Sequence, residues 1–455
     1  MGDEGMDKSY SAEFVVCGAG TAGSVAAIAA ADQGLDVILI DQFGCAGGSA
    51  TLSLVTPMMS SKIEGNPQCS YIGAEINRRM ETLGAQVGKV WFDPEMLKFV
   101  LEEMLTERGV KRLYHTVICG AEKENGKVTS VIAANKSGIA VIEGKVFLDA
   151  TGDADLCACL ELPLLHGNEE DGANQPMSLR YILGGVNLDA FWKQIAIASG
   201  TPADDARPEN FDGAVTNTFG ANYPLRPLFL KAVENGDLLP EDAAYWQFFT
   251  IPGRADGLAL NCPEFFDIHD ADDTDNLTRV QVDGKHAILR QLAFYRKYLS
   301  GFEKAYIAAA APMVGVRESR RAITEHMLTI EECVGHARFP DAICRTNYHV
   351  DVHGKTLKNL NLPGWDVNAP YYEIPLRSLI VKDVDNLMVA GRDLGSEFVA
   401  QSSARIIPTC RAMGEAAGIA AGMVIHSGSQ KCASIDGADV RRIMMMYGAE
   451  FDTAE

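Results

Sequence analysis

The stretch that decides the fold reads Phe14-Val15-Val16-Cys17-Gly18-Ala19-Gly20-Thr21-Ala22-Gly23 and continues through an alanine-rich run to Asp32. A second apolar run, Leu35 to Ile40, follows and is closed by Asp41. An apolar run of strand length, a glycine turn, a helix-forming segment and a second apolar run together predict a βαβ unit.

Three glycines at G-x-G-x-x-G spacing have separate roles in such a unit. Gly18 permits the tight turn out of the strand, Gly20 lets bare backbone approach a pyrophosphate, and Gly23 lets the helix pack closely. The N-terminus of the helix presents unpaired N–H groups to that pyrophosphate. Asp41 lies 23 residues after Gly18, about the distance at which an acid accepts hydrogen bonds from a ribose. The sequence therefore predicts a dinucleotide-binding unit, the alternative being a glycine-rich turn in another α/β protein.

Length and composition describe a large, acidic, globular chain. Its 455 residues predict about two or three domains, and its formal charge of −21 argues against binding to nucleic acid or to an anionic membrane. The odd number of scattered cysteines, 11 in all, is typical of reduced thiols. With no signal-like N-terminus and no apolar segment of spanning length, we expect a cytoplasmic protein. Cys157-Ala158-Cys159 has no second pair, so no metal site is predicted.

A second glycine loop follows the βαβ unit. It contains Gly47, Gly48, Ser49 and Thr51, where bare backbone and hydroxyl donors suit a ligand; a flexible surface loop is the alternative. Asp93-Pro94-Glu95 then predicts the start of a helix that runs to about Arg108.

Three strand-like runs come next: 113–120, 127–134 and 139–148. Turn signals separate them, so they predict a β-meander. The third run leads into Asp149-Ala150-Thr151-Gly152-Asp153, which again brings bare backbone to the carboxyl edge of the sheet. A plain nicotinamide dehydrogenase does not need this meander, whereas many FAD-binding domains contain one.

Several motifs, in this order along the chain, carry a resemblance: Gly18-x-Gly20-x-x-Gly23, Gly47-Gly48-Ser49-Ala50-Thr51, Ala150-Thr151-Gly152-Asp153, Gly315-Val316-Arg317-Glu318-Ser319-Arg320-Arg321, Asp351-Val352-His353, Ile374-Pro375-Leu376-Arg377-Ser378-Leu379 and Asn386-Leu387-Met388-Val389-Ala390-Gly391-Arg392-Asp393. From about residue 14 to 425, the chain resembles the FAD-dependent oxidoreductases of the glutathione-reductase-like flavoprotein superfamily.

The resemblance implies an α/β fold with a Rossmann-like FAD-binding domain, made of a parallel sheet with a β-meander, and an inserted α+β substrate or cap domain. The expected boundaries are 1–165 and 372–455 for the two parts of the FAD-binding domain, and 166–371 for the substrate domain. The implied FAD contacts are Gly18, Gly20, Gly23, Asp41, Gly47, Gly48, Ser49, Thr51, Val117, Ala150, Gly152, Asp153, Gly391, Arg392, Asp393, Arg405 and Thr409. Asp393 is expected near the ribityl chain or pyrophosphate, and Pro408 is expected to open a small-residue helix whose N-terminus faces the isoalloxazine.

The middle of the chain predicts a largely antiparallel sheet with helices that covers the flavin. Helices are predicted over 286–296 and 302–312. The acidic segment from Asp267 to Asp275 lacks the glycine and glutamate of a calcium loop, so we expect a solvated loop.

Few residues have the chemistry to assist a flavin. His353 titrates near neutrality and is the acid/base candidate. Arg317 and Arg377 suit a substrate carboxylate or a flavin phosphate. Tyr372 is an alternative proton donor, and Cys45 an alternative site of covalent flavin attachment. A purely structural role is the alternative for each of them.

The expected function is FAD-dependent oxidation or reduction of a small organic substrate by hydride transfer at flavin N5. Because the sequence has no second G-x-G-x-x-G, electrons are expected from the substrate, from a small reductant or from a separate partner protein. A redox-sensing flavoprotein and a nicotinamide-dependent dehydrogenase are the alternatives.

Overall fold

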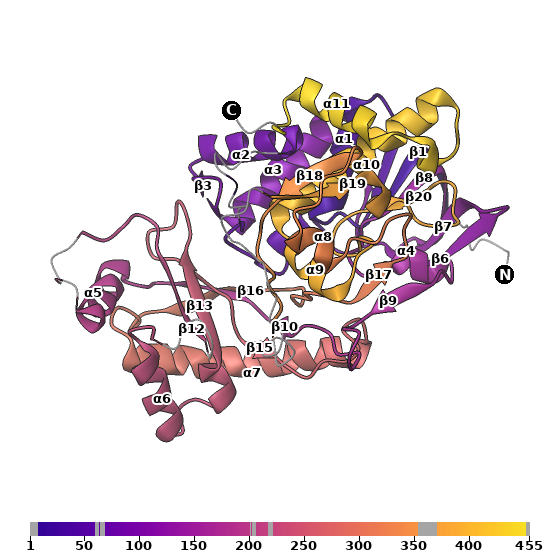
Figure 1. Cartoon of the computed structure of the whole chain (residues 1–455). Coiled ribbons are helices and arrows are strands. Elements are labelled where there is room, and N and C mark those ends of the chain that lie inside the picture. Colours follow the sequence, from indigo (N-terminus) through magenta and orange to yellow (C-terminus); the bar gives the residue numbers. More distant parts are fainter. Residues whose placement is uncertain are drawn as a thin grey trace.

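The structure is a computed structural model that describes residues 8–59, 63, 69–200, 202, 206–216, 222–353 and 371–451. The chain forms two lobes (Figure 1). One lobe contains both the beginning and the end of the chain, and the other is built from its middle.

The first lobe is organised on a seven-stranded sheet of order β5-β2-β1-β8-β7-β6, in which β20 also pairs with β8. The strands are β1 (Lys8–Cys17), β2 (Val37–Ile40), β5 (Lys111–Leu113), β6 (Val117–Glu124), β7 (Lys127–Asn135), β8 (Gly138–Asp149) and β20 (Leu387–Val389). The pairs β1–β2, β1–β8, β2–β5 and β8–β20 are parallel, whereas β6, β7 and β8 form an antiparallel meander. The predicted Rossmann-like sheet with a meander is confirmed.

Helices cover this sheet, and their sequences explain their close packing. They are α1 (Thr21–Asp32), α2 (Tyr71–Thr82), α3 (Pro94–Glu107), α10 (Ile407–Ser427) and α11 (Gly437–Tyr447). α10 lies directly on α1: a Cβ at Gly414 would lie 2.1 Å from the Ala22 carbonyl oxygen, and one at Gly418 would lie 2.4 Å from that of Ala26. α3 begins as predicted, since the Asp93 carboxylate accepts the N–H of Glu95 at 2.8 Å.

The second lobe has an antiparallel sheet of order β12-β13-β14-β11-β16. Its elements are β11 (Tyr181–Gly184), α5 (Leu188–Ser199), β12 (Asp212–Thr216), α6 (Arg226–Glu234), β13 (Tyr245–Thr250), β14 (Leu258–Leu260), α7 (Thr274–Tyr298) and β16 (Tyr306–Ala310). An aromatic core joins sheet and helices, and the buried Trp246 indole donates to the Tyr295 hydroxyl at 2.9 Å. The antiparallel sheet with helices was expected from the sequence.

The remaining elements are short. They are the strand pairs β3 (Gln86–Val87) with β4 (Trp91–Phe92), β9 (Leu164–His166) with β17 (Arg320–Ala322), β10 (Met177–Ser178) with β15 (Glu264–Phe265) and β18 (Ala342–Thr346) with β19 (Tyr372–Pro375), and the helices α4 (Asp155–Cys159), α8 (Ile330–Val334) and α9 (Phe398–Ala404). Among them, β18, β19, α8 and α9 pack in the core of the first lobe.

Two predicted elements are wrong. The run 113–120 is two strands, because the chain turns at His115, whose φ is +51°, so that β5 joins β2 and β6 opens the meander. The segment 302–312 is a strand rather than a helix: β16 pairs with β11 at the edge of the second sheet. A short alanine-rich run is compatible with the periodicity of a helix and with that of a strand. Here the pairing of β16 with β11 favours the strand. The predicted helix 286–296 is the second half of α7, which Asp273 of the acidic segment caps by accepting the Asn276 N–H at 2.9 Å.

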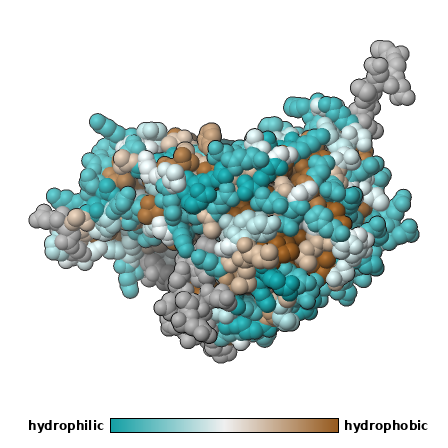
Figure 2. Space-filling model, turned by 90° about the horizontal axis from the view of Figure 1, so that it is seen from above, coloured by the Kyte–Doolittle hydropathy of each residue, from teal (hydrophilic) through white to brown (hydrophobic). Residues whose placement is uncertain are grey.

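The surface seen in Figure 2 is mostly hydrophilic, with hydrophobic residues in small separate patches. No helix within the described ranges has the length and apolar character to cross a membrane.

Candidate active site

A cavity of about 2090 Å³ runs along the carboxyl ends of the parallel strands and continues between the two lobes. Gly18, Asp41, Ala150 and Gly391, which line it, follow β1, β2, β8 and β20 directly or by two residues. Ligands of open α/β sheets bind at this edge.

Bare backbone forms one wall of the cavity. Gly18 has φ +95°, and a Cβ there would lie 2.4 Å from the Ala150 carbonyl oxygen. A Cβ at Gly48 would lie 2.7 Å from the Gly20 Cα. At Gly20 itself a Cβ would meet only the Ala150 oxygen, at 3.6 Å. Gly18 and Gly48 are therefore required by the protein's own packing, whereas the missing side chain of Gly20 leaves space only for a ligand.

Three predicted contacts, Gly23, Gly47 and Thr51, support this wall from behind and do not line the cavity. A Cβ at Gly23 would lie 1.9 Å from the Gly18 oxygen, so Gly23 serves helix packing. The Thr51 hydroxyl donates to the Ala46 carbonyl at 2.8 Å and lies under Gly47, whose φ is +105°. They shape the glycine loop, while Ser49 lines the cavity.

Asp41 ends β2 at the rim of the cavity. Its carboxylate accepts the N–H of Ala19 at 2.6 Å and that of Phe43 at 2.8 Å. Burial raises the pKa of this carboxyl in spite of the two hydrogen bonds. Val117, half exposed, also lines the cavity. The acid is thus rigidly held where the sequence predicts a ribose contact.

A polar network joins three distant parts of the chain at the next section of the wall. Arg392 pairs with Asp153 at 2.8 Å and donates to the Ser319 hydroxyl at 3.0 Å. Gly152 lies against the guanidinium, since a Cβ there would be 3.0 Å from Arg392 Nη2. Arg392, Asp153 and Gly152 all line the cavity.

Asp393 and Thr409 are buried beside the cavity and do not line it. Neither carboxylate oxygen of Asp393 has a hydrogen-bond partner among the described residues. Burial, and after it the charge of Asp149, raises the pKa of Asp393 well above its usual range. The structure therefore places Asp393 behind the cavity wall, next to the lining residues Gly391 and Arg392, and not in the predicted contact with the ligand.

The N-terminus of α10 opens onto the same cavity. Its cap Ile406, its first residue Ile407 and the preceding Arg405 are lining residues. The positive end of the helix dipole therefore points at the space between the lobes. The glycine wall, Asp41 and this helix end together fit a flavin dinucleotide.

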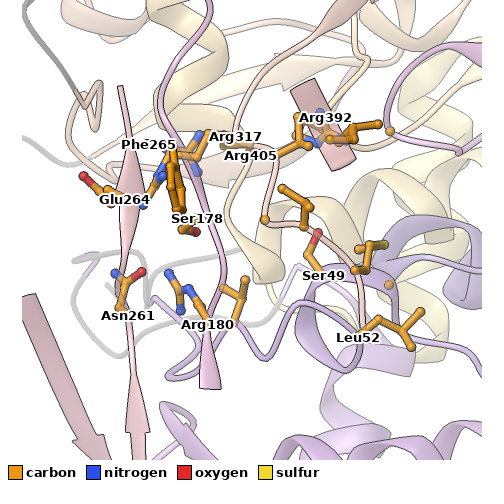
Figure 3. A pocket seen from close by; sticks show the side chains of 18 of the residues that line it. Ser49, Leu52, Ser178, Arg180, Asn261, Glu264, Phe265, Arg317, Arg392 and Arg405 are labelled. Atoms are coloured by element: carbon orange, nitrogen blue, oxygen red, sulfur yellow. Dashed lines mark hydrogen bonds and ion pairs between the residues drawn. The ribbon is translucent and has the colours of Figure 1, made fainter. Parts of the chain in front are cut away.

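Segments from both lobes bring a cluster of charged side chains together in the cavity, and Figure 3 labels three of them, Glu264, Arg317 and Arg405. Glu264 pairs with Arg317, and its Oε1 lies 3.0 Å from His353 Nδ1. Asp351 Oδ1 lies 3.2 Å from His353 Nε2, and the Asp351 carbonyl accepts from Arg405 at 2.9 Å. His353 is thus held between two carboxylates.

Short strand pairs assemble this cluster. Glu264 in β15 lies opposite Ser178 in β10, and Ser178 forms an isolated bridge with Gly315, two residues before Arg317. The Asp351 N–H donates to Ser402 in α9 at 3.2 Å. Segments far apart in sequence therefore fix each charged group.

The charged groups of this cluster shift one another's pKa values. Burial acts to raise the pKa of Glu264 and of Asp351, but the neighbouring Arg317 and His353 outweigh it, so both carboxyls have lowered pKa values. Burial and Arg317 act to lower the pKa of His353, but Glu264 and Asp351 outweigh them and the pKa is raised. Burial lowers the pKa of Arg405. The stable arrangement is a protonated imidazole between two carboxylates.

Three candidates from the sequence lie elsewhere. The Tyr372 hydroxyl is buried and shares a 2.7 Å hydrogen bond with Ser403, away from the cavity. Arg377 is half exposed and pairs with Asp341 at 2.9 Å on another surface. Cys45 does not line the cavity either. None of these three side chains lines the cavity, although their motifs lie near site residues in the sequence.

The sequence reasoning missed Glu264 and Arg180, both of which line the cavity. Each is a single charged residue inside an apolar run, Cys262 to Phe266 and Met177 to Gly185. A charge inside an apolar run is the signal that could have found them, because such a charge needs a buried partner or a ligand. Tyr245, which packs edge-on against His353 with ring centroids 5.3 Å apart, was also missed.

The fold and the cavity define a dinucleotide-binding α/β enzyme with a second lobe over the ligand. A family model described as FAD dependent oxidoreductase matches residues 13–444, and the chain belongs to this family. It is an FAD-dependent enzyme, and FAD is the cofactor that the cavity fits.

Solved structures at low identity are similar along most of the chain. A geranylgeranyl bacteriochlorophyll reductase-like protein from Thermoplasma acidophilum has a TM-score of 0.45 at 12% identity, covering 96% of this chain and 83% of that one. A flavin-dependent brominase has a TM-score of 0.47 at 12% identity, covering 96% and 83%. p-Nitrophenol 4-monooxygenase from Pseudomonas putida has a TM-score of 0.43 at 9% identity, covering 97% and 87%. No curated protein sequence matches the chain.

Proposed function

We propose that the enzyme transfers a hydride between flavin N5 and a small organic substrate that binds between the two lobes. When bound, FAD supplies the hydride acceptor or donor, and the protein positions the substrate, excludes water and handles the proton. The parallel sheet, the β6–β8 meander and the return of the chain through β20 support a place in the glutathione-reductase-like superfamily.

The size of the cavity supports a second ligand beside the cofactor. Sites for single small molecules or cofactors usually have volumes of about 300–1,000 Å³. The cavity measures about 2090 Å³, and its lining continues past the glycine wall to Tyr245, Gln247 and Asn261 of the second lobe. This polar far wall is where we place the substrate.

The observation that carries the proposal is the position of His353. Its ring lines the cavity, and both ring nitrogens face ionised carboxylates, Glu264 at 3.0 Å and Asp351 at 3.2 Å. The imidazole therefore holds a proton at each nitrogen. A substrate that displaces one of the two carboxylates from the ring can accept the proton of that nitrogen. The other carboxylate then keeps the ring oriented.

The source of electrons follows from what the sequence contains. It has no second G-x-G-x-x-G, so we propose that electrons enter or leave through the substrate, through a small reductant or through a separate partner protein.

The test is an anaerobic half-reaction. Oxidised, FAD-loaded enzyme is mixed with small organic acids, alcohols and amines, and loss of the flavin absorption is followed. With the compound that reduces it fastest, His353→Ala should keep the flavin spectrum and lower the rate of reduction. His286, an exposed histidine that also lines the cavity, provides the matched control His286→Ala. Equal rates in both variants would refute the role of His353.

A further inference from the structure

Arg180 is a charged side chain of the cavity that the mechanism above does not use. It lies between β10 and β11 at the lower wall in Figure 3, across the cavity from Ser49 and Leu52. Its one protein hydrogen bond among the described residues is a long one, from Nη1 to the Thr56 carbonyl at 3.4 Å. Its Nε is buried without a partner there.

The other charges of the site are already paired. Arg317 pairs with Glu264, Arg405 contacts Asp351, and His353 lies between the two carboxylates. Within the described part of the chain, no carboxylate forms an ion pair with Arg180. Three guanidinium groups therefore face two carboxylates, and the site has a surplus positive charge even before the imidazolium is counted.

This surplus is costly without a ligand. Burial, and after it the charge of Arg317, lowers the pKa of Arg180 to about 10, so the group is still charged at neutral pH. A charge removed from water is stabilised by an opposite charge with directed hydrogen bonds. The guanidinium fork matches a carboxylate best, because two parallel N–H groups bind its two oxygens.

Neutral polar groups complete the surroundings of this guanidinium. Asn261 donates to the Tyr245 hydroxyl at 2.7 Å and to Gln247 at 2.9 Å, and its own Oδ1 has no partner among the described residues. Ser178 lines the cavity beside them. A ligand that places an anionic group on Arg180 therefore meets both an acceptor and donors.

We propose that Arg180 binds a carboxylate of the substrate, so that the enzyme acts on a small carboxylic acid. This assignment rests on the proposed function for its substrate, and it adds the chemical class that the site selects. The carboxylate neutralises the one unpaired cation of the described wall, and the rest of the molecule extends toward His353 and the glycine wall.

The binding test does not require turnover. Oxidised, FAD-loaded enzyme is titrated with benzoate and with propionate, and each is compared with its neutral isostere, benzamide or propionamide, by the change in the visible flavin spectrum. Both carboxylates should produce a saturable change, and the amides should bind at least about tenfold more weakly.

Substitutions of Arg180 test whether this side chain binds the carboxylate. Arg180→Met should keep its FAD and weaken carboxylate binding by about 10- to 100-fold, and Arg180→Lys should recover part of it because the charge returns without the fork. The matched control is Arg290→Gln, which removes a cation of the same cavity that is already paired with Asp242 at 2.6 Å. This control should bind benzoate like the parent.

Three results would overturn the assignment: no spectral change with either carboxylate at full FAD content, equal binding of acids and amides, or unchanged binding in Arg180→Met. A slower reduction of the flavin in Arg180→Met with unchanged carboxylate binding would overturn it too, and would assign the arginine to the cofactor. Carboxylate binding in an enzyme whose flavin no organic acid, alcohol or amine reduces in the anaerobic half-reaction would support this inference and count against hydride transfer.

Discussion

Replacing Gly20 by alanine separates cofactor binding from folding. Gly20 has φ −66°, which every residue adopts, and its added Cβ would meet only the Ala150 oxygen, at an ordinary 3.6 Å. The FAD-free protein should therefore lose no stability, and a smaller unfolded-state entropy could add about 0.4–1 kcal/mol. The methyl group instead occupies space that the cavity wall leaves for a pyrophosphate.

The magnitude follows from the contact that is displaced. A backbone N–H to a charged oxygen contributes about 1.5–3 kcal/mol, and moving the phosphate away from the N-terminus of α1 removes at least one such bond. At about 1.4 kcal/mol per tenfold, FAD affinity should fall by about 10- to 150-fold.

The assay combines two measurements on each variant: the urea midpoint of FAD-free protein, and the FAD dissociation constant from flavin fluorescence. Gly34, at the far end of α1, is the control, because its φ is +83° and a Cβ added there would have no atom within 4 Å. Gly34→Ala should lose stability through backbone strain and keep its FAD affinity. The reasoning would be refuted if Gly20→Ala bound FAD like the parent, or lost FAD only because it failed to fold.

Three further changes test other parts of the account. His353→Gln should retain FAD and lower turnover by about 100-fold or more, as loss of an acid/base group does; a rate near that of the parent would remove His353 from the mechanism. Burial raises the pKa of Glu415 from 4.5 to about 8. Its folded state therefore binds the proton more tightly, and stability should fall as pH rises from about 4.5 to 8, by up to about 1.4 kcal/mol per pH unit. In Glu415→Gln, the difference between the urea midpoints at pH 5.5 and pH 7.5 should be smaller than in the parent. An unchanged difference would show that Glu415 is not the source of the pH dependence. Arg321→Met leaves the fully buried Glu318 without its ion pair and should lower the free energy of unfolding by about 3–5 kcal/mol. An unfolding midpoint equal to that of the parent would show that another group compensates for the charge of Glu318.

The sequence predicted the parts of the fold that local chemistry determines. Asp93 and Pro94 specify the start of α3, and the glycine spacing around Gly18 specifies the turn from β1 into α1. Both depend on backbone geometry and on neighbours within a few residues. The same is true of the turns that separate β6, β7 and β8.

Local chemistry singled out His353 and Arg317 but did not predict the groups of the charged wall that surround them, Glu264 and Arg180. Glu264 faces Ser178 through two strands of two residues each. It thereby joins His353, whose other carboxylate, Asp351, lies only two residues away in the sequence. Such short pairings leave no periodic pattern in the sequence. Tyr372 illustrates the reverse, because its motif adjoins the site while its hydroxyl bonds to Ser403 in the core.

The measurement that tests the central claim most directly is a crystal structure of the enzyme with FAD and benzoate. We expect the pyrophosphate against Gly20, the flavin ring between Ser49 and the charged wall, and the benzoate carboxylate on Arg180 within hydrogen-bonding distance of its guanidinium. A flavin ring bound away from His353, or a carboxylate bound elsewhere in the cavity, would contradict this claim.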